Sequence, residues 1–216
     1  DIEVAITSDT TVAASQLNRL DENTLGTVDA TSVQSVYGAV NELNTAYAAG
    51  DITGLGNEDV TLTDGTLNDA EAGSDAAALN TLDGRTSGQI NAESVDSISG
   101  SISDLGTAYT SSEIANLGDS DETATTTDGT TTAAALNTLD VQTDSATVDA
   151  GSVAIISGAV NELNIAHESN DISNLGDSDI EVAITSDTTV AASQLNRLDE
   201  NTLGTVDATS VQSVYG

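Results

Sequence analysis

The chain of 216 residues contains no cysteine, proline, methionine, tryptophan, phenylalanine or lysine. The absence of cysteine excludes a disulfide framework and thiol chemistry. The absence of proline leaves every backbone N–H available for sheet pairing. Four tyrosines are the only aromatic residues, so the sequence lacks both the large apolar side chains of a typical core and the ring platforms of a sugar-binding cleft. This composition favours burial shared between stacked or partner segments over one large core.

Positive charge is also scarce. Thirty-six Asp and Glu residues face only three basic residues (Arg19, Arg85 and Arg197), which gives a formal net charge of −33. Such a surface repels nucleic acid and anionic membranes, because phosphate binding depends on Lys and Arg. No apolar run approaches the roughly 18 residues that a membrane span needs, so no membrane insertion is expected. The charge is best tolerated at high ionic strength, which indicates a marine or calcium-rich exterior.

What the sequence does have is an exact internal repeat. Residues 1–38 and 179–216 are identical, so that Asp1 corresponds to Asp179 and Gly38 to Gly216. We call residues 1–178 one period. We expect this stretch to be a window of a longer periodic protein, in which each unit contacts mainly its neighbours. Such periodicity favours a structural role over catalysis.

The period contains three degenerate copies of a shorter unit. The sequence LNRLD at 17–21 returns as LNTLD at 79–83 and at 136–140, and TVDA at 27–30 returns as QINA and TVDA. These landmarks predict a partial repeat at 1–26, repeat units at 27–88, 89–146 and 147–204, and the start of a further unit at 205–216.

Each unit is expected to carry two helices. The stronger helix is predicted to begin after Asp29, Asn91 and Asp149, which are good N-cap residues. Its apolar residues recur with 3-4-3-4 spacing, which is the a/d seam of a two-heptad coiled coil but also fits an amphipathic helix that packs on its own chain. In the coiled-coil interpretation, the oligomer seam consists of Val33, Val36, Val40, Leu43, Tyr47, Val95, Ile98, Ile102, Leu105, Tyr109, Val153, Ile156, Val160, Leu163 and His167.

The weaker helix is predicted over roughly residues 11–23, with counterparts near Ala76 and Thr132. Short segments with period-two alternation at 3–7, 59–63 and 181–185 predict β-strands, and residues 122–127 form a poorer strand candidate. Helices and strands this short are marginal alone. We therefore expect several chains side by side, with helices in bundles and strands pairing between chains or winding into a β-prism.

Few residues point to chemistry. His167 takes the place of Tyr47 and Tyr109 in the seam, where three copies in a trimer could hold a metal ion, although a partly solvated histidine at a fraying coil end is the simpler interpretation. Acidic turns at 55–59, 117–122 and 175–179 could bind Ca²⁺, or could be solvated turns. No nucleophile–base arrangement and no phosphate-binding motif is present. We expect no enzyme and no cofactor apart from possible Ca²⁺.

The phrases AVNELNTAY, SGAVNELN, LNTLDGRTSG and TVDATSV resemble segments of phage tail fibres and neck whiskers, and of giant extracellular repeat proteins of marine cyanobacteria. This resemblance implies a mixed α+β repeat fibre, elongated and homotrimeric, with parallel coiled-coil helices between short β segments. It further implies a mechanical spacer for host attachment on the virion surface of a marine, cyanobacterial phage, with itself as partner and the host surface contacted by other parts. The alternative is an extracellular filament or adhesin on a marine bacterial cell surface.

Overall fold

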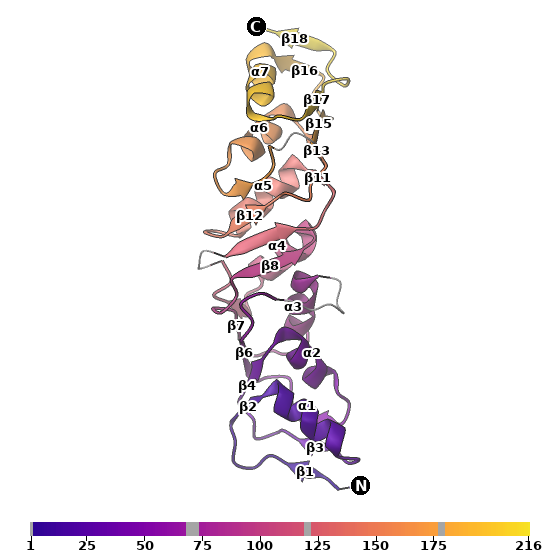
Figure 1. Cartoon of the computed structure of the whole chain (residues 1–216), viewed down its shortest axis with the longest axis vertical. Helices are drawn as coiled ribbons and strands as arrows, with labels where there is room; N and C mark the ends of the chain where they lie inside the picture. Colours follow the sequence, from indigo (N-terminus) through magenta and orange to yellow (C-terminus); the bar gives the residue numbers. More distant parts are fainter. Residues whose placement is uncertain (1, 68–73, 119–121, 177–179) are drawn as a thin grey trace. The chain divides into compact units, whose positions relative to one another are not determined.

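A computed structural model describes residues 2–67, 74–118, 122–176 and 180–216. Within these ranges the chain forms seven short α-helices and eighteen short β-strands that alternate along the sequence (Figure 1). The helices are α1 (Ala14–Asn23), α2 (Val40–Ala48), α3 (Asp75–Asp83), α4 (Ile102–Thr110), α5 (Ala133–Gln142), α6 (Val160–Glu168) and α7 (Ala192–Asn201). The strands are β1 (Val4–Ala5), β2 (Thr11–Ala13), β3 (Val28–Asp29), β4 (Ser35–Gly38), β5 (Ile52–Thr53), β6 (Asp59–Leu62), β7 (Ile90–Asn91), β8 (Ser97–Gly100), β9 (Ile114–Ala115), β10 (Thr123–Thr126), β11 (Thr130–Thr132), β12 (Thr147–Asp149), β13 (Ile155–Gly158), β14 (Ile172–Ser173), β15 (Glu181–Ile184), β16 (Thr189–Ala191), β17 (Thr205–Asp207) and β18 (Ser213–Tyr215).

The strands form five sheets, and every described strand pair is parallel. The strand orders are β1-β3-β5, β2-β4-β6-β7-β9, β14-β12-β10-β8, β11-β13-β15-β17 and β16-β18. Parallel neighbours need a crossover connection of a dozen or more residues. Here most crossovers contain one of the helices, so the fold belongs to the α/β class.

The sheet register places equivalent residues of successive turns of the chain next to each other. Val12 pairs with Val36, and Val36 pairs with Val60, so one turn of the chain leads from each valine to the next. The following turn, from Val60 to its partner Ile90, is longer. We call each such turn, with its strands and its one helix, a coil. Each repeat unit of the sequence contains two helices and therefore two coils.

The contacts divide the chain into two compact units, Asp1–Ile98 with Thr107–Ser120, and Ser99–Gly106 with Asp121–Gly216. Within the first unit α1 packs on α2 and α2 packs on α3; within the second, α5 packs on α6 and α6 packs on α7 (Figure 1). In each of these four pairs, the helix of one coil therefore contacts the helix of the next coil. The apolar core of each unit lies between these helices and the strands, where leucines such as Leu43 and Leu136 are fully buried.

The expected mixed α+β, elongated, homotrimeric coiled-coil fibre is wrong. The predicted seam does not lie on one helix, because Val33 lies just after the turn at 31–32, Val36 lies in strand β4, and only Val40 onward is helical. The remaining helix, α2, has only 9 residues, which is too short for a two-heptad coiled coil. Its apolar stripe packs on neighbouring coils of the same chain, which was the alternative interpretation of the 3-4 spacing, so a partner chain is not needed to bury it.

The predicted N-caps are also wrong. Asp29, Asn91 and Asp149 lie at the ends of strands β3, β7 and β12. Their side-chain oxygens accept hydrogen bonds from backbone N–H groups two positions further on, at 3.0–3.1 Å, and so close a tight turn before the next strand. The same oxygen that would cap a helix here stabilises a turn.

The weaker helices were predicted correctly, as α1, α3 and α5, although α1 begins only after the short strand β2. The alternating segments are strands β1, β6 and β15, and the poorer candidate is strand β10. These strands pair with strands of the same chain, in contrast to the expected pairing between chains.

Candidate functional site

The side chains that were assigned to an oligomer seam line the interior of the single chain. Eleven of the fifteen are buried, and the other four, Tyr47, Ile102, Tyr109 and His167, are half-buried. The expected homotrimer loses its basis, because the apolar surface that would have formed it is already covered by neighbouring coils. The contacts that recur along the described chain are those at which one coil meets the next.

A carboxylate from the following coil caps the N-terminus of every second helix. Asp64 accepts a hydrogen bond from the backbone N–H of Val40, the first residue of α2, at 2.8 Å. Asp128 accepts one from Ile102 at 2.8 Å, and Asp187 accepts one from Val160 at 2.6 Å. The N-cap positions of α2 and α6 are occupied by alanine, which offers no side-chain oxygen. The free N–H groups and the helix dipole are therefore neutralised from outside the helix.

Asparagine side chains connect the helices of adjacent coils. Asn18 of α1 donates to the carbonyl oxygen of Glu42 in α2 at 2.9 Å, and the buried Asn44 of α2 donates to that of Ala78 in α3, also at 2.9 Å. The second unit repeats this arrangement. Asn137 of α5 donates to the carbonyl oxygen of Glu162 in α6, and Asn164 of α6 donates to that of Gln194 in α7. The LN-x-LD and NELN sequences thus place an amide at each of these coil–coil contacts.

An ion pair adds to the contact between α6 and α7. The guanidinium of Arg197 binds both carboxylate oxygens of Glu168, and Asn201 donates to the same carboxylate at 3.0 Å. These bonds lower the pKa of Glu168 and raise the pKa of Arg197. The pair is accessible to solvent, so it contributes more to specificity than to stability.

The identical segments 1–38 and 179–216 show the packing of one coil on the next from both sides. In the first copy the side chains facing the following coil are buried, and in the second copy those facing the preceding coil are buried. Leu20 is 36% exposed, whereas the equivalent Leu198 is 0% exposed. Conversely, Val36 is 0% exposed and its equivalent Val214 is 53% exposed. One sequence therefore carries two packing faces, and each is covered wherever a neighbouring coil is present.

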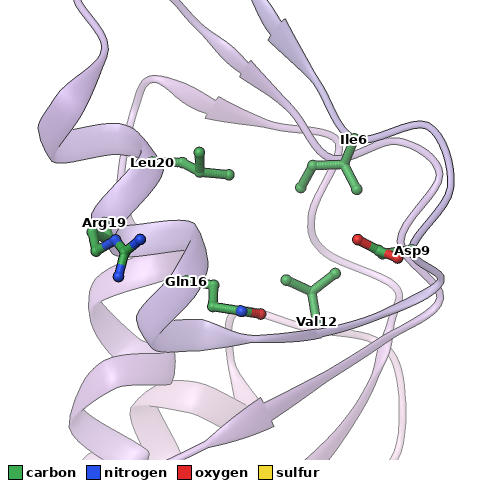
Figure 2. A pocket seen from close by; sticks show the side chains of 6 residues that line it. All are labelled: Ile6, Asp9, Val12, Gln16, Arg19 and Leu20. Carbon is green, nitrogen blue, oxygen red and sulfur yellow. The ribbon is translucent and has the colours of Figure 1, made fainter.

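The face that is uncovered in the first copy forms a depression of about 220 Å³ (Figure 2). Ile6, Val12 and Leu20 point into it, with Asp9 on the opposite loop. Gln16 and Arg19 of α1 complete the lining. The depression combines apolar and polar side chains and contains no arrangement of nucleophile and base.

Tyr47, one of the two tyrosines at the position that His167 takes in the third repeat unit, has a polar partner. The hydroxyl of Tyr47 donates to the carboxylate of the buried Glu58 at 3.4 Å, and burial next to this carboxylate raises the tyrosine pKa. Glu58 also accepts from the backbone N–H groups of Gly56 and Asn57 at 2.6 and 3.1 Å. The acidic turn at 55–59 thus directs one of its carboxylates inward. Sequence reasoning missed this buried acid, because nothing in the turn sequence distinguishes Glu58 from its exposed acidic neighbour.

His167 is half-buried, and among the described residues neither of its ring nitrogens has a hydrogen-bond partner. Burial lowers its pKa. Within the described ranges no three His, Cys, Asp or Glu side chains lie close enough to hold a metal ion. The acidic turns at 117–122 and 175–179 lie partly outside the described residues.

No family model, curated protein or solved structure matches this chain. Among the residues described, no helix is both long and apolar enough to cross a membrane. The candidate functional surface is therefore defined by the chain's own geometry, as the face through which one coil receives another.

Proposed function

We propose that this chain is a structural repeat segment whose function is mechanical: it is a spacer in a surface protein, and its reach is set by the number of repeats. The observation that supports this most directly is the reciprocal burial of the identical segments 1–38 and 179–216. A folded segment that can pack a neighbouring coil on each of its two opposite faces is suited to a chain of many repeats, and less suited to a domain with a fixed number of them.

The repeated contacts between coils support the same function. Helix caps supplied by the next coil, and asparagines that donate to the next helix, make each coil depend on its neighbours. Load is then shared over many equivalent contacts. We place this spacer on the virion surface of a marine phage, following the resemblance to virion attachment proteins. The high acidic charge would keep such exposed repeats apart from one another and soluble.

The second candidate is the same spacer role in a surface protein of a marine bacterium. It is favoured by the same net charge of −33 and by the resemblance to extracellular repeat proteins. The two locations differ in what carries the protein, so the test must be done on native material.

The experiment labels native particles and host cells with gold-conjugated antibodies raised against this chain. A second pair of antibodies, against the parts flanking the repeats, then measures the spacing in strains engineered to carry one or two additional periods. A spacer predicts an equal increment for each added period, with attachment retained. Spacing that does not change, or a substrate turned over by the purified chain, would contradict the spacer role; label on the cell instead of the particle would select the bacterial alternative.

A further inference from the structure

We propose that the depression formed by Ile6, Asp9, Val12, Gln16, Arg19 and Leu20 is a docking site for one occupant: a copy of segment 147–178, the coil that carries β13 and α6. This inference rests on the proposed function and deepens it, because it assigns the partner of one surface and the groups that recognise it. Each lining residue has an identical counterpart in segment 179–216, where such a coil is present.

The capping contact provides the first correspondence. Asp187 accepts a hydrogen bond from the N–H of Val160, which begins α6 in the preceding coil. Asp9 is the same residue of the repeat and lies beside the depression (Figure 2). It thus presents a carboxylate where the second copy binds a helix N-terminus, and this arrangement favours a partner whose helix starts over Asp9.

The charged contact provides the second correspondence. Arg197 binds Glu168, the last residue of α6, whereas Arg19 has no ion pair among the described residues. The depression therefore has an anionic group at one side and a cationic group at the other. A helix that places its positive N-terminus at Asp9 and a glutamate near its C-terminus at Arg19 matches both, and α6 has this polarity.

The sheet edge provides the third correspondence. In the second copy β15 pairs with β13 of the preceding coil and with β17 of the following one. In the first copy β1 is an edge strand, and β3 is its one partner among the described strands. The backbone N–H groups of Glu181 and Thr185 donate to the carbonyl oxygens of Ala154 and Gly158, at 2.8 and 3.0 Å. The occupant would extend the sheet of β1 in the same register.

The apolar lining completes the match. Ile184, Val190 and Leu198 are buried in the second copy, where α6 packs on α7 and β13 pairs with β15. Their counterparts Ile6, Val12 and Leu20 surround the depression. The space that a small ligand would occupy is thus the space that the preceding coil occupies elsewhere in the same chain.

The test uses the absence of cysteine from the sequence. Leu20→Cys and Leu198→Cys are made separately in the full chain, and the rate of reaction with a neutral maleimide is measured for each. We expect the thiol at position 20 to react about tenfold faster than the thiol at position 198, because only the former lacks a covering coil. The same two variants are then made in a chain extended by a copy of residues 147–178 placed directly before Asp1.

In the extended chain we expect the thiol at position 20 to slow to about the rate of that at position 198, which itself stays unchanged as the internal control. Asp9→Ala with Arg19→Ala in the extended chain should restore faster reaction. Circular dichroism checks that the added helix forms.

Three results would overturn the proposal. One is an unchanged rate at position 20 in an extended chain whose added helix has formed. Another is full protection that persists in the Asp9→Ala, Arg19→Ala variant. The third is equal, slow reaction of both thiols in the unextended chain, which would mean that another occupant, such as the end of a second molecule, covers the depression. If the thiol is protected in the extended chain but the antibody spacing does not increase with added periods, the docking site is supported and the spacer role is rejected.

Discussion

The carboxylate of Asp64 accepts a hydrogen bond of 2.8 Å from the backbone N–H of Val40, although the two residues are far apart in the sequence. The sheet register makes the same step along the chain, because Val36 pairs with Val60. The helix cap and the strand pairing are therefore set by the same turn of the chain. A helix that cannot cap itself is completed only when the next coil is in place, which couples the folding of neighbouring coils.

Removing this cap should weaken the first unit. Asp64→Ala leaves the N-terminal N–H groups of α2 without their acceptor, and we expect a loss of about 1 kcal/mol in the free energy of unfolding. Urea titrations followed by circular dichroism measure it. Asp51→Ala is the control, because it removes the same charge from an exposed loop residue. Equal effects of the two substitutions would show that net charge, and not capping, is responsible.

Gly88 should not tolerate a side chain. A Cβ at this position would overlap the carbonyl oxygen of Glu58, which belongs to the adjacent backbone and cannot turn away. We expect Gly88→Ala to destabilise the fold by about 1–3 kcal/mol, as overpacking does. Gly50→Ala is the matched control, since no described residue other than its two chain neighbours lies within 4 Å of the added Cβ. Thermal melts of the two variants compare them; similar melting temperatures would argue against the close approach.

His167 should make stability depend on pH. Burial lowers its pKa in the folded chain, so the unfolded chain, with a pKa of about 6.5, binds the proton more readily. The stability contributed by the neutral imidazole is fully present above the unfolded pKa. It decreases as the pH falls below that value, and levels off once the folded pKa is passed.

Replacement by tyrosine, the residue at the equivalent positions 47 and 109, isolates this effect. The difference in melting temperature between the natural chain and His167→Tyr should grow in favour of the variant between pH 7.5 and 5.5 (about one pH unit on either side of the unfolded pKa). A difference that is constant over this range would mean that the imidazole titrates as it does in water.

Salt should stabilise the chain without a preference for calcium. With 36 acidic and three basic residues, repulsion between carboxylates opposes folding, and added ions screen it. Melting temperatures should therefore rise similarly in NaCl and CaCl₂ at equal ionic strength. A large increase at millimolar Ca²⁺ alone would instead identify a specific calcium site.

Several of the local elements could be predicted from the amino-acid sequence alone. Period-two alternation marked β1, β6 and β15, and the LNRLD and LNTLD segments marked α1, α3 and α5. The sequence also determined the two-helix unit and the exact recurrence of residues 1–38 at 179–216. These features can be found from spacing and propensity, which act directly between residues close together in the chain, and from comparing the sequence with itself.

The surfaces against which these elements pack could not be predicted in the same way, because they depend on how the chain folds back on itself. The 3-4 spacing of Val33, Val36, Val40 and Leu43 fits a helix, yet Val36 lies in a strand, because the stripe runs from the turn after β3 through β4 before α2 begins. Spacing also cannot distinguish a partner chain from the next coil, since both offer apolar surface. Nor can local sequence reveal that Asp64 caps the helix of the preceding coil. That contact exists only because parallel pairing returns the chain to the same place after each turn.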